Sequence, residues 1–156
     1  MIQLSSFMQE KLISLDLRSR SKQEVFEEMT DLISQSESVP DREAFLSALK
    51  EREAVMTTGI GMGVGIPHAR SDSIRNLVIA VGISKQGIDF GAVDDQLVRI
   101  VFMIGIPARE TKLYLQVLAA ITRFARKRSN RDALLAARSK EDVYAVFQRF
   151  DRASLA

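Results

Sequence analysis

Residues 77–107 read LVIAVGISKQGIDFGAVDDQLVRIVFMIGIP, and this apolar stretch decides the fold class. Two runs within it, LVIAVGIS at 77–84 and LVRIVFMIGIP at 97–107, have the length and the Val and Ile content of buried strands. The dipeptide QG at 86–87 predicts a turn into the short segment IDF, and DD at 94–95 predicts a second turn. We expect the run at 97–107 to be the longest strand.

Upstream of these strands the sequence predicts two helices and one short strand. Ser21 and Glu24 have the spacing of a capping box, and apolar residues then recur at helical spacing, so we expect a helix over about 22–35. A second helix is expected over about 42–53. Leu and Ile alternate with polar residues within 12–17, which predicts a short strand there.

Downstream of the strands two more helices are predicted. The first begins at Thr111, and one of its faces is expected to carry Leu115, Leu118, Ala119 and Thr122. The second follows a capping sequence that starts at Ser139, and its apolar residues are Val143, Val146, Phe147 and Phe150. Helices on both sides of a block of strands indicate an α/β (α+β) domain, in which a mixed central β-sheet is flanked by helices.

Composition is consistent with one domain spanning residues 1–156. Hydrophobic residues make up 46% and charged residues 27% of the chain, close to the globular average. No apolar run is long enough to cross a membrane, and the first residues lack the basic and apolar regions of a secretory signal. There is no cysteine, so disulfides and thiolate metal sites are excluded, and we expect a cytoplasmic protein without membrane insertion.

The chain is mildly basic, with a net charge of +2 and a pI near 9.1. Most of the excess positive charge lies late in the sequence, at Arg123, Arg126, Lys127, Arg128, Arg131 and Arg138. Nucleic-acid binding is not expected, because few aromatic residues are interleaved with these cations. A solvated helix end, with cations that complement the helix dipole, and a docking face for an acidic protein both remain open.

The segment TTGIGMGVGIPHAR at 57–70 is unlike the rest of the chain and contains the only histidine, His68. A lone histidine is more often structural than catalytic, but here four alternating glycines and Pro67 precede it. Consecutive amides in such a segment can form an anion-binding concavity, and a neutral imidazole is a good nucleophile near pH 7. A nucleophile beside an anion cradle indicates phosphoryl transfer, and we expect apolar side chains such as Met62 and Ile66 to ring the site.

Other glycine-rich or histidine chemistries fit less well. The glycines follow a predicted helix and alternate strictly, unlike the G-x-G-x-x-G of dinucleotide-binding folds, and the lysine of a P-loop is absent. One histidine without a nearby pair of acidic ligands offers too few donors for a metal site, and no G-x-S-x-G elbow of a serine hydrolase is present. We therefore expect neither a bound metal nor a cofactor.

The ordered motifs RE at 52–53, TGIG at 58–61 and GVGIPH at 63–68 resemble the signature of phosphotransferase-system enzyme IIA domains of the fructose, mannitol and nitrogen-regulatory type. The resemblance extends to the predicted first helix, to the central strands and to LYLQVLAAITRFAR at 113–126. It implies a phosphotransferase component with a mixed sheet flanked by helices. It further implies that His68 is a phosphoacceptor, loaded by the phosphocarrier HPr or by its nitrogen-branch counterpart.

The same resemblance assigns roles to three further residues. Arg52 matches the arginine near the active histidine, where a guanidinium can hold phosphoryl oxygens, although pairing with Glu51 or Glu53 is the alternative. Thr58 either donates a hydrogen bond to the phosphoryl group or closes the turn before the glycines. Tyr114 occupies the position at which many relatives have a second histidine.

Two other positions also depart from the family pattern, because Met62 stands where an asparagine is usual and Gly65 where an alanine is common. The segment GIDFGAVDDQ and the lack of a fused IIB or IIC domain favour the nitrogen-regulatory branch, in which the phosphorylation state controls binding to target proteins. A soluble IIA that passes phosphoryl groups to a IIB protein for sugar uptake is the alternative. A binding module that has lost phosphotransfer is the third hypothesis. The sequence does not identify the sugar, the regulated target or the oligomeric state.

Overall fold

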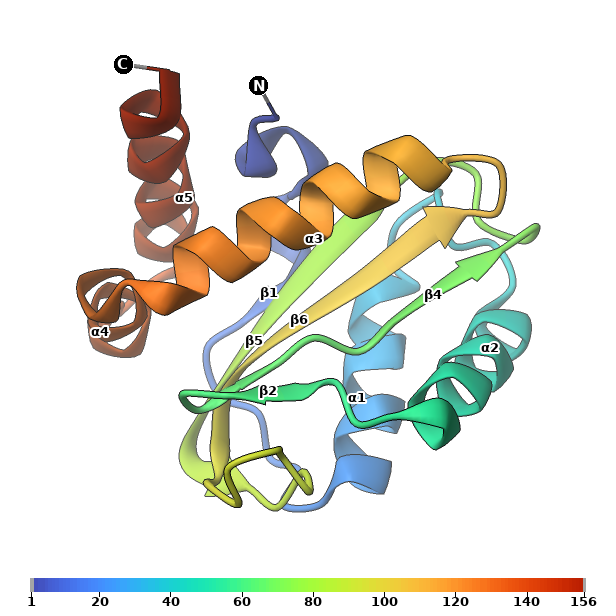
Figure 1. The fold of residues 1–156 in the computed structure, drawn as a ribbon, viewed down its shortest axis with the longest axis horizontal. Helices are drawn as coiled ribbons and strands as arrows, with labels where there is room; N and C mark the ends of the chain where they lie inside the picture. Colours follow the sequence, from blue (N-terminus) through green and yellow to red (C-terminus); the bar gives the residue numbers. More distant parts are fainter. Residues whose placement is uncertain (1, 156) are drawn as a thin grey trace.

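The two central strands, β5 (Val78–Ile88) and β6 (Val98–Pro107), pair antiparallel in the middle of a six-stranded mixed sheet (Figure 1). The computed structural model describes residues 2–155. β1 (Ile13–Ser14) runs parallel to β5 at one edge. Along the other side of β6 lie β3 (Val64–Gly65) and then β4 (His68–Ser71), both parallel to it, and β2 (Gly59–Gly61) pairs antiparallel with β3.

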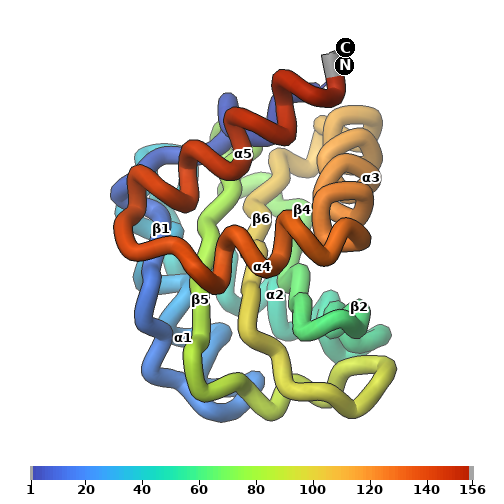
Figure 2. The backbone as a smooth tube through the Cα atoms, turned by 90° about the vertical axis from the view of Figure 1, so that its left-hand side faces the viewer, coloured from blue at the N-terminus to red at the C-terminus, as the bar shows by residue number. Residues whose placement is uncertain are grey.

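Helices cover both faces of this sheet. One layer contains α1 (Lys22–Ile33) and α2 (Arg42–Val55). The other contains α3 (Thr111–Arg126), α4 (Arg128–Ala136) and α5 (Lys140–Leu155). Two short 3₁₀ helices near the N-terminus, Leu4–Phe7 and Glu10–Leu12, belong to the same layer. Figure 2 shows α4 lying between the end of α3 and the start of α5.

The pleat of β6 divides its apolar side chains between two cores, because successive residues of a strand point to opposite faces. Phe102 and Ile104 pack against α3 and α5, whereas Val101 and Met103 pack toward α1 and α2. Three aromatic rings from three elements meet in the first core, where Phe124 stacks on Phe147 at 4.5 Å and Phe102 meets both edge-on. The predicted fold class is therefore confirmed.

Local signals placed several element boundaries correctly. Ser21 and Glu24 form a complete capping box at the start of α1, and the Ser139 hydroxyl accepts a hydrogen bond from the Asp142 amide at the start of α5. The turn at 94–95 is present, with Asp95 in the left-handed region at φ 59°. The predicted strand over 12–17 is reduced to the two residues of β1, although the Leu17 amide still bonds to Ile83.

The structure differs from the sequence predictions at further elements. The expected turn at 86–87 is a bulge inside β5, because Gly87 at φ 88° lets the strand shift register and continue to Ile88. β5 is consequently the longest strand, with 11 residues against 10 in β6. α4 was not predicted.

The predicted face of α3 is wrong as well. Leu115 is 58% exposed, because the buried face is rotated around the helix from the predicted one; its members are Val117, Ala120, Ile121, Phe124 and Ala125. Within residues 2–155, no helix has the length and hydropathy needed to span a membrane.

Candidate functional site

A cleft of about 620 Å³ is lined by residues of α2, of β4 and of the first turn of α3. Figure 1 shows α2 beside β4 at the edge of the sheet. The residues that line the cleft are Ala48, Glu51, Arg52, Val55, His68, Ala69, Arg70, Ala108 and Tyr114. His68 is the first residue of β4 and pairs with Ile104 of the central strand, whose amide bonds to the Pro67 carbonyl at 3.0 Å. The middle of the sheet therefore holds the histidine backbone in place.

Two hydrogen bonds fix the ring of His68, which is only 6% exposed. Nδ1 lies 2.7 Å from the carbonyl oxygen of Ile66, and because that oxygen can only accept, Nδ1 carries the proton. In the neutral ring the lone pair is then on Nε2, which lies 3.2 Å from the hydroxyl of Tyr114 and accepts a hydrogen bond from it. The nitrogen that faces the cleft is the nucleophilic one.

The surroundings of His68 favour the neutral ring. Burial lowers the pKa of His68 below its ordinary value of 6.5, and the positive charge of Arg52 lowers it further. The bond to Ile66 and the carboxylate of Glu53 act in the opposite direction without cancelling the shift. Near pH 7 the ring is thus an uncharged nucleophile.

Two guanidinium groups line the cleft with His68. Arg52 donates to the carbonyl oxygen of Met56 at 2.9 Å, just past the end of α2, and makes no ion pair with the described carboxylates of Glu51 and Glu53. Arg70 donates to the Thr111 hydroxyl at 2.8 Å and lies over the Tyr114 ring, 5.6 Å from its centroid.

Arg70 was missed by the sequence reasoning. A signal was nevertheless present, because Arg70 is two residues after His68, and residues two apart on a strand point to the same side. Once His68 is placed on a strand, its cationic neighbour at that spacing belongs to the same site.

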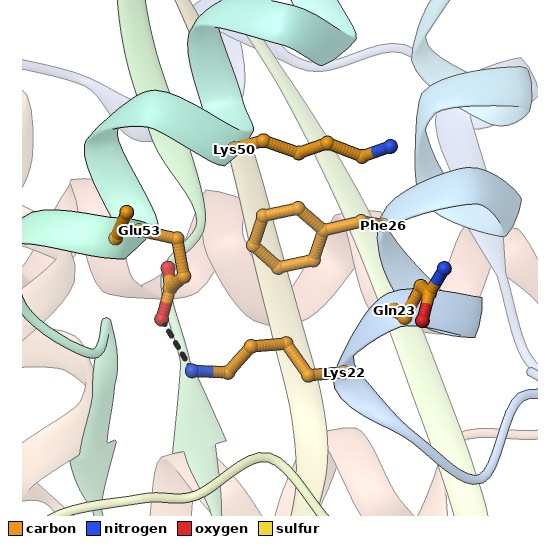
Figure 3. A pocket seen from close by; sticks show the side chains of 6 residues that line it. Lys22, Gln23, Phe26, Lys50 and Glu53 are labelled. Atoms are coloured by element: carbon orange, nitrogen blue, oxygen red, sulfur yellow. Dashed lines mark hydrogen bonds and ion pairs between the residues drawn. The ribbon is translucent and has the colours of Figure 1, made fainter.

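Thr58 does not line the cleft. Its hydroxyl donates to one carboxylate oxygen of Glu53 at 2.6 Å, and its amide donates to the other at 2.8 Å. Figure 3 shows the third partner of that carboxylate, the ammonium group of Lys22, at 2.8 Å. The carbonyl of Thr58 in turn accepts from the Ile66 amide at 2.9 Å. Thr58 is thus part of a chain of contacts that leads from Lys22 to the carbonyl holding His68.

The expected anion cradle of glycine amides is wrong, since none of Gly59, Gly61, Gly63 and Gly65 lines the cleft. These glycines build the β2–β3 hairpin, whose Met62 amide bonds to the Asp94 carboxylate at 3.0 Å. Gly59 is required by space, because a Cβ atom there would lie 2.8 Å from the backbone of Ala92.

The expected apolar ring of Met62 and Ile66 is likewise not found. Met62 lies at the hairpin turn beside Arg131, and Ile66 is 3% exposed and contributes its carbonyl. The exposed apolar residue of the cleft is Val55, which is 80% exposed.

Comparison with known proteins agrees with this geometry. Residues 6–150 match the family model described as "Phosphoenolpyruvate-dependent sugar phosphotransferase system, EIIA 2". A PTS system fructose-specific EIIA component of Haloferax volcanii is 41% identical over 136 residues, which cover 87% of this chain and 88% of that protein. The nitrogen regulatory protein of Escherichia coli is 30% identical over 147 residues, or 93% of this chain and 89% of the relative.

A solved structure extends the similarity to three dimensions. The nitrogen regulatory protein IIA-Ntr of Neisseria meningitidis superposes with a TM-score of 0.87 at 28% identity, covering 92% of this chain and 98% of that one. The sequence match spans nearly the whole chain, and the fold around the single histidine agrees with it. The chain therefore belongs to the EIIA 2 family of the phosphoenolpyruvate-dependent sugar phosphotransferase system and is a phosphotransferase component of the kind that carries phosphohistidine.

Proposed function

We propose that Nε2 of His68 accepts a phosphoryl group from a phosphohistidine on an HPr-type carrier protein and later gives it up. The observation that supports this most directly is the neutral Nε2 lone pair facing a cleft with two guanidinium groups. In the transfer, the nitrogen–phosphorus bond of the donor breaks as the bond between phosphorus and Nε2 forms. The donor imidazole leaves with the electron pair of the broken bond, and His68 keeps its proton on Nδ1.

In this proposal Arg52 and Arg70 stabilise the phosphoryl group during and after transfer. Charge moves onto the equatorial phosphoryl oxygens in the transition state, and preplaced cations in a site partly shielded from water stabilise that charge strongly. Each guanidinium uses one donor in the resting protein, so others are free to bind oxygens. Tyr114 must release Nε2 before attack, and its hydroxyl can then donate to a phosphoryl oxygen.

For the acceptor, we propose a IIB protein of the fructose type. The 41% identity to a fructose-specific EIIA component exceeds the 30% identity to the nitrogen regulatory protein, so the sugar branch takes precedence over the branch favoured by the sequence motifs. A regulatory role is the second candidate, supported by the TM-score of 0.87 with IIA-Ntr. Both roles use phosphoryl groups derived from phosphoenolpyruvate, and on that basis we assign the protein to the cytoplasm.

Reconstitution with enzyme I, an HPr-type carrier and radiolabelled phosphoenolpyruvate tests the acceptor. The wild-type protein is expected to take up label in an acid-labile, base-stable form, as a phosphoramidate does. His68→Ala is expected to remain folded, with a melting temperature close to wild type, and to take up none. Label on His68→Ala, or an acid-stable adduct, contradicts the assignment.

A chase experiment distinguishes the role in sugar uptake from the regulatory role. Unlabelled fructose-type IIB protein added to the phosphorylated protein is expected to remove the label within the time of loading. If label stays on His68 while the phosphorylated and unphosphorylated forms recover different proteins from cell extract, the regulatory role replaces sugar uptake.

A further inference from the structure

A second cleft, which we call the basic cleft, is lined by residues from the end of α3, from α4 and from α5. Figure 2 shows how these three helices follow one another along one side of the molecule. The volume of the basic cleft is about 460 Å³, within the range of small-molecule sites. It is lined by Arg123, Lys127, Ser129, Asn130, Ala133, Val146, Arg149, Phe150, Ala153 and Ser154. No acidic residue is among them, and none of them lines the cleft of His68.

The three cations of the basic cleft, Arg123, Lys127 and Arg149, have no ion pair in the part of the chain that the structure describes. The ion pairs of the described residues lie between α1 and α2, within α2 between Arg42 and Glu43, and along α4 between Arg128 and Asp132. Three cations that line one cleft and form no ion pair repel one another, and a bound anion reduces that repulsion. The cleft therefore combines a concave shape with an unbalanced positive charge.

The three cations are not needed as partners for the free carbonyl groups at the C-terminal end of α3. The carbonyl oxygen of Phe124 already accepts from the side-chain amide of Asn130 at 3.0 Å, and that of Ala125 accepts from Arg131 at 2.6 Å. Arg131 thus fills the helix-end role expected for the basic segment, while Arg123, Lys127 and Arg149 keep all their side-chain donors free. α4 also begins here without a side-chain cap, since Lys127 at its N-cap position cannot accept a hydrogen bond.

We propose that the basic cleft binds the phosphate monoester of a small polyol or sugar. Guanidinium and ammonium groups bind a phosphate dianion by charge-assisted hydrogen bonds. The hydroxyl oxygens of Ser129 and Ser154 can accept from sugar hydroxyls, and the partly buried Phe150 provides an apolar wall. An extended polyanion such as RNA is a poorer fit, because the cleft is short and its aromatic ring is not available for stacking from both sides.

The site is separate from the phosphoryl-transfer site on the same helix. Tyr114 lies in the first turn of α3, and Arg123 and Lys127 lie at its last turn and its end, about 14–20 Å farther along at 1.5 Å per residue. A ligand in the basic cleft therefore binds without occupying the space around His68. The proposal does not depend on His68 being the phosphoacceptor.

Isothermal titration of the full chain with fructose 1-phosphate, inorganic phosphate and neutral fructose tests the proposal. Saturable binding of the sugar phosphate is expected, with weaker binding of inorganic phosphate and none of fructose. Arg149→Gln and Lys127→Gln should each weaken binding about tenfold, because each loses a hydrogen bond to a charged group. Arg152→Gln is the matched control, since this exposed arginine of α5 does not line the cleft, and it should bind like wild type.

Titration of the Arg52→Gln variant shows whether the sugar phosphate binds in the basic cleft or beside His68. If Arg52→Gln abolishes sugar-phosphate binding while Arg149→Gln does not, the ligand binds beside His68 and the proposal is wrong. The absence of saturable binding by the wild-type protein overturns it too. Binding of a single-stranded RNA oligonucleotide in preference to the sugar phosphate would replace the proposed ligand class.

Discussion

At the scale of single residues, Tyr114 is the most informative side chain of the site. Its hydroxyl lies 3.2 Å from Nε2 of His68, so it competes for the lone pair in the resting state and is positioned to donate to a phosphoryl group. Tyr114→Phe is expected to shorten the lifetime of the phosphohistidine about tenfold, because a hydrogen bond to a charged group is worth about 1.5–3 kcal/mol. The measurement is the decay of radiolabel at neutral pH after removal of the donor.

Tyr144→Phe provides a matched control for that experiment. Tyr144 is the only other tyrosine, and its hydroxyl donates to the Ser5 carbonyl at 3.2 Å, away from the cleft. Each variant loses one hydroxyl, but only Tyr114→Phe should alter the lifetime, with little change in its melting temperature. Equal lifetimes in the two variants would leave Tyr114 with a packing role.

The pKa of His68 can be followed directly, because a chain with one histidine gives one set of imidazole resonances. Burial and the charge of Arg52 lower the pKa below 6.5, so the loading rate should stay high at pH 6.5 and fall at lower pH as Nε2 is protonated. Arg52→Gln is expected to raise the pKa toward 6.5, and Glu53→Gln to lower it further. Titration by nuclear magnetic resonance measures both shifts; shifts in the same direction would contradict this electrostatic account.

The same shift affects stability with a definite sign. The pKa of His68 is lower in the folded than in the unfolded protein, so below pH 6.5 the unfolded chain binds more protons than the folded one. The free energy of unfolding therefore decreases as the pH falls below 6.5.

At the scale of elements, Glu53 joins α1, α2 and the segment that leads to β2. Its side chain is 8% exposed and accepts from Lys22, from the Thr58 hydroxyl and from the Thr58 amide. Glu53→Gln is expected to destabilise the protein by about 1–3 kcal/mol, because an uncharged amide offers one acceptor oxygen and leaves buried donors unpaired. Urea denaturation measures the change, and Glu51→Gln on the exposed side of α2 should lie close to wild type. A similar loss in both variants would show that the Glu53 contacts add nothing specific.

How far the sequence predicted the elements depended on whether local signals were sufficient. Ser21 and Ser139 cap their own helices, so α1 and α5 were placed correctly from a few residues. Gly87 resembled a turn residue, and only the pairing of β5 with β6 turns it into a bulge. Leu115 was assigned to a buried face because helical periodicity alone did not fix which side of α3 faces the core; Leu113 of the same turn packs against the core, whereas Leu115 is exposed. Non-local packing decided each of these errors.

The candidate site was likewise predictable only where local motifs were sufficient. His68 was indicated by its own glycine-rich segment as well as by a family resemblance, and Arg52 and Tyr114 by the resemblance. The structure brings all three into one cleft. Arg70 joined them only once β4 was known to be a strand. For Thr58 the sequence left two roles open, a hydrogen bond to the phosphoryl group or closing the turn before the glycines. Its hydroxyl is bonded to Glu53, a contact that spacing in the sequence does not specify.

At the scale of the whole molecule, a buried carboxylate ties the two ends of the chain together. Asp151 of α5 is 4% exposed and accepts three hydrogen bonds, from the Leu4 amide at 2.8 Å, the Ser5 amide at 2.9 Å and the Ser5 hydroxyl at 2.6 Å. The first 3₁₀ helix is thereby fixed to the last helix, over the core in which Phe124 and Phe147 stack. None of these groups lines the cleft of His68, so stability and phosphoryl transfer should be separable.

Asp151→Asn tests that separation. The side-chain amide keeps one acceptor oxygen but places an NH₂ group against a backbone N–H, so about 2–4 kcal/mol of stability should be lost, the cost of unpaired buried donors near a former charge. Asp132→Asn is the control, because Asp132 forms only an exposed pair with Arg128 at 3.7 Å, and such a pair contributes about 0.3–0.5 kcal/mol. Urea denaturation should show a large loss for Asp151→Asn and almost none for Asp132→Asn, while the labelling rate at 25 °C and the imidazole resonances of His68 stay as in wild type. If those resonances move in Asp151→Asn, the contact between the chain ends reaches the phosphoryl-transfer site through the sheet, and the two halves of the molecule do not act independently.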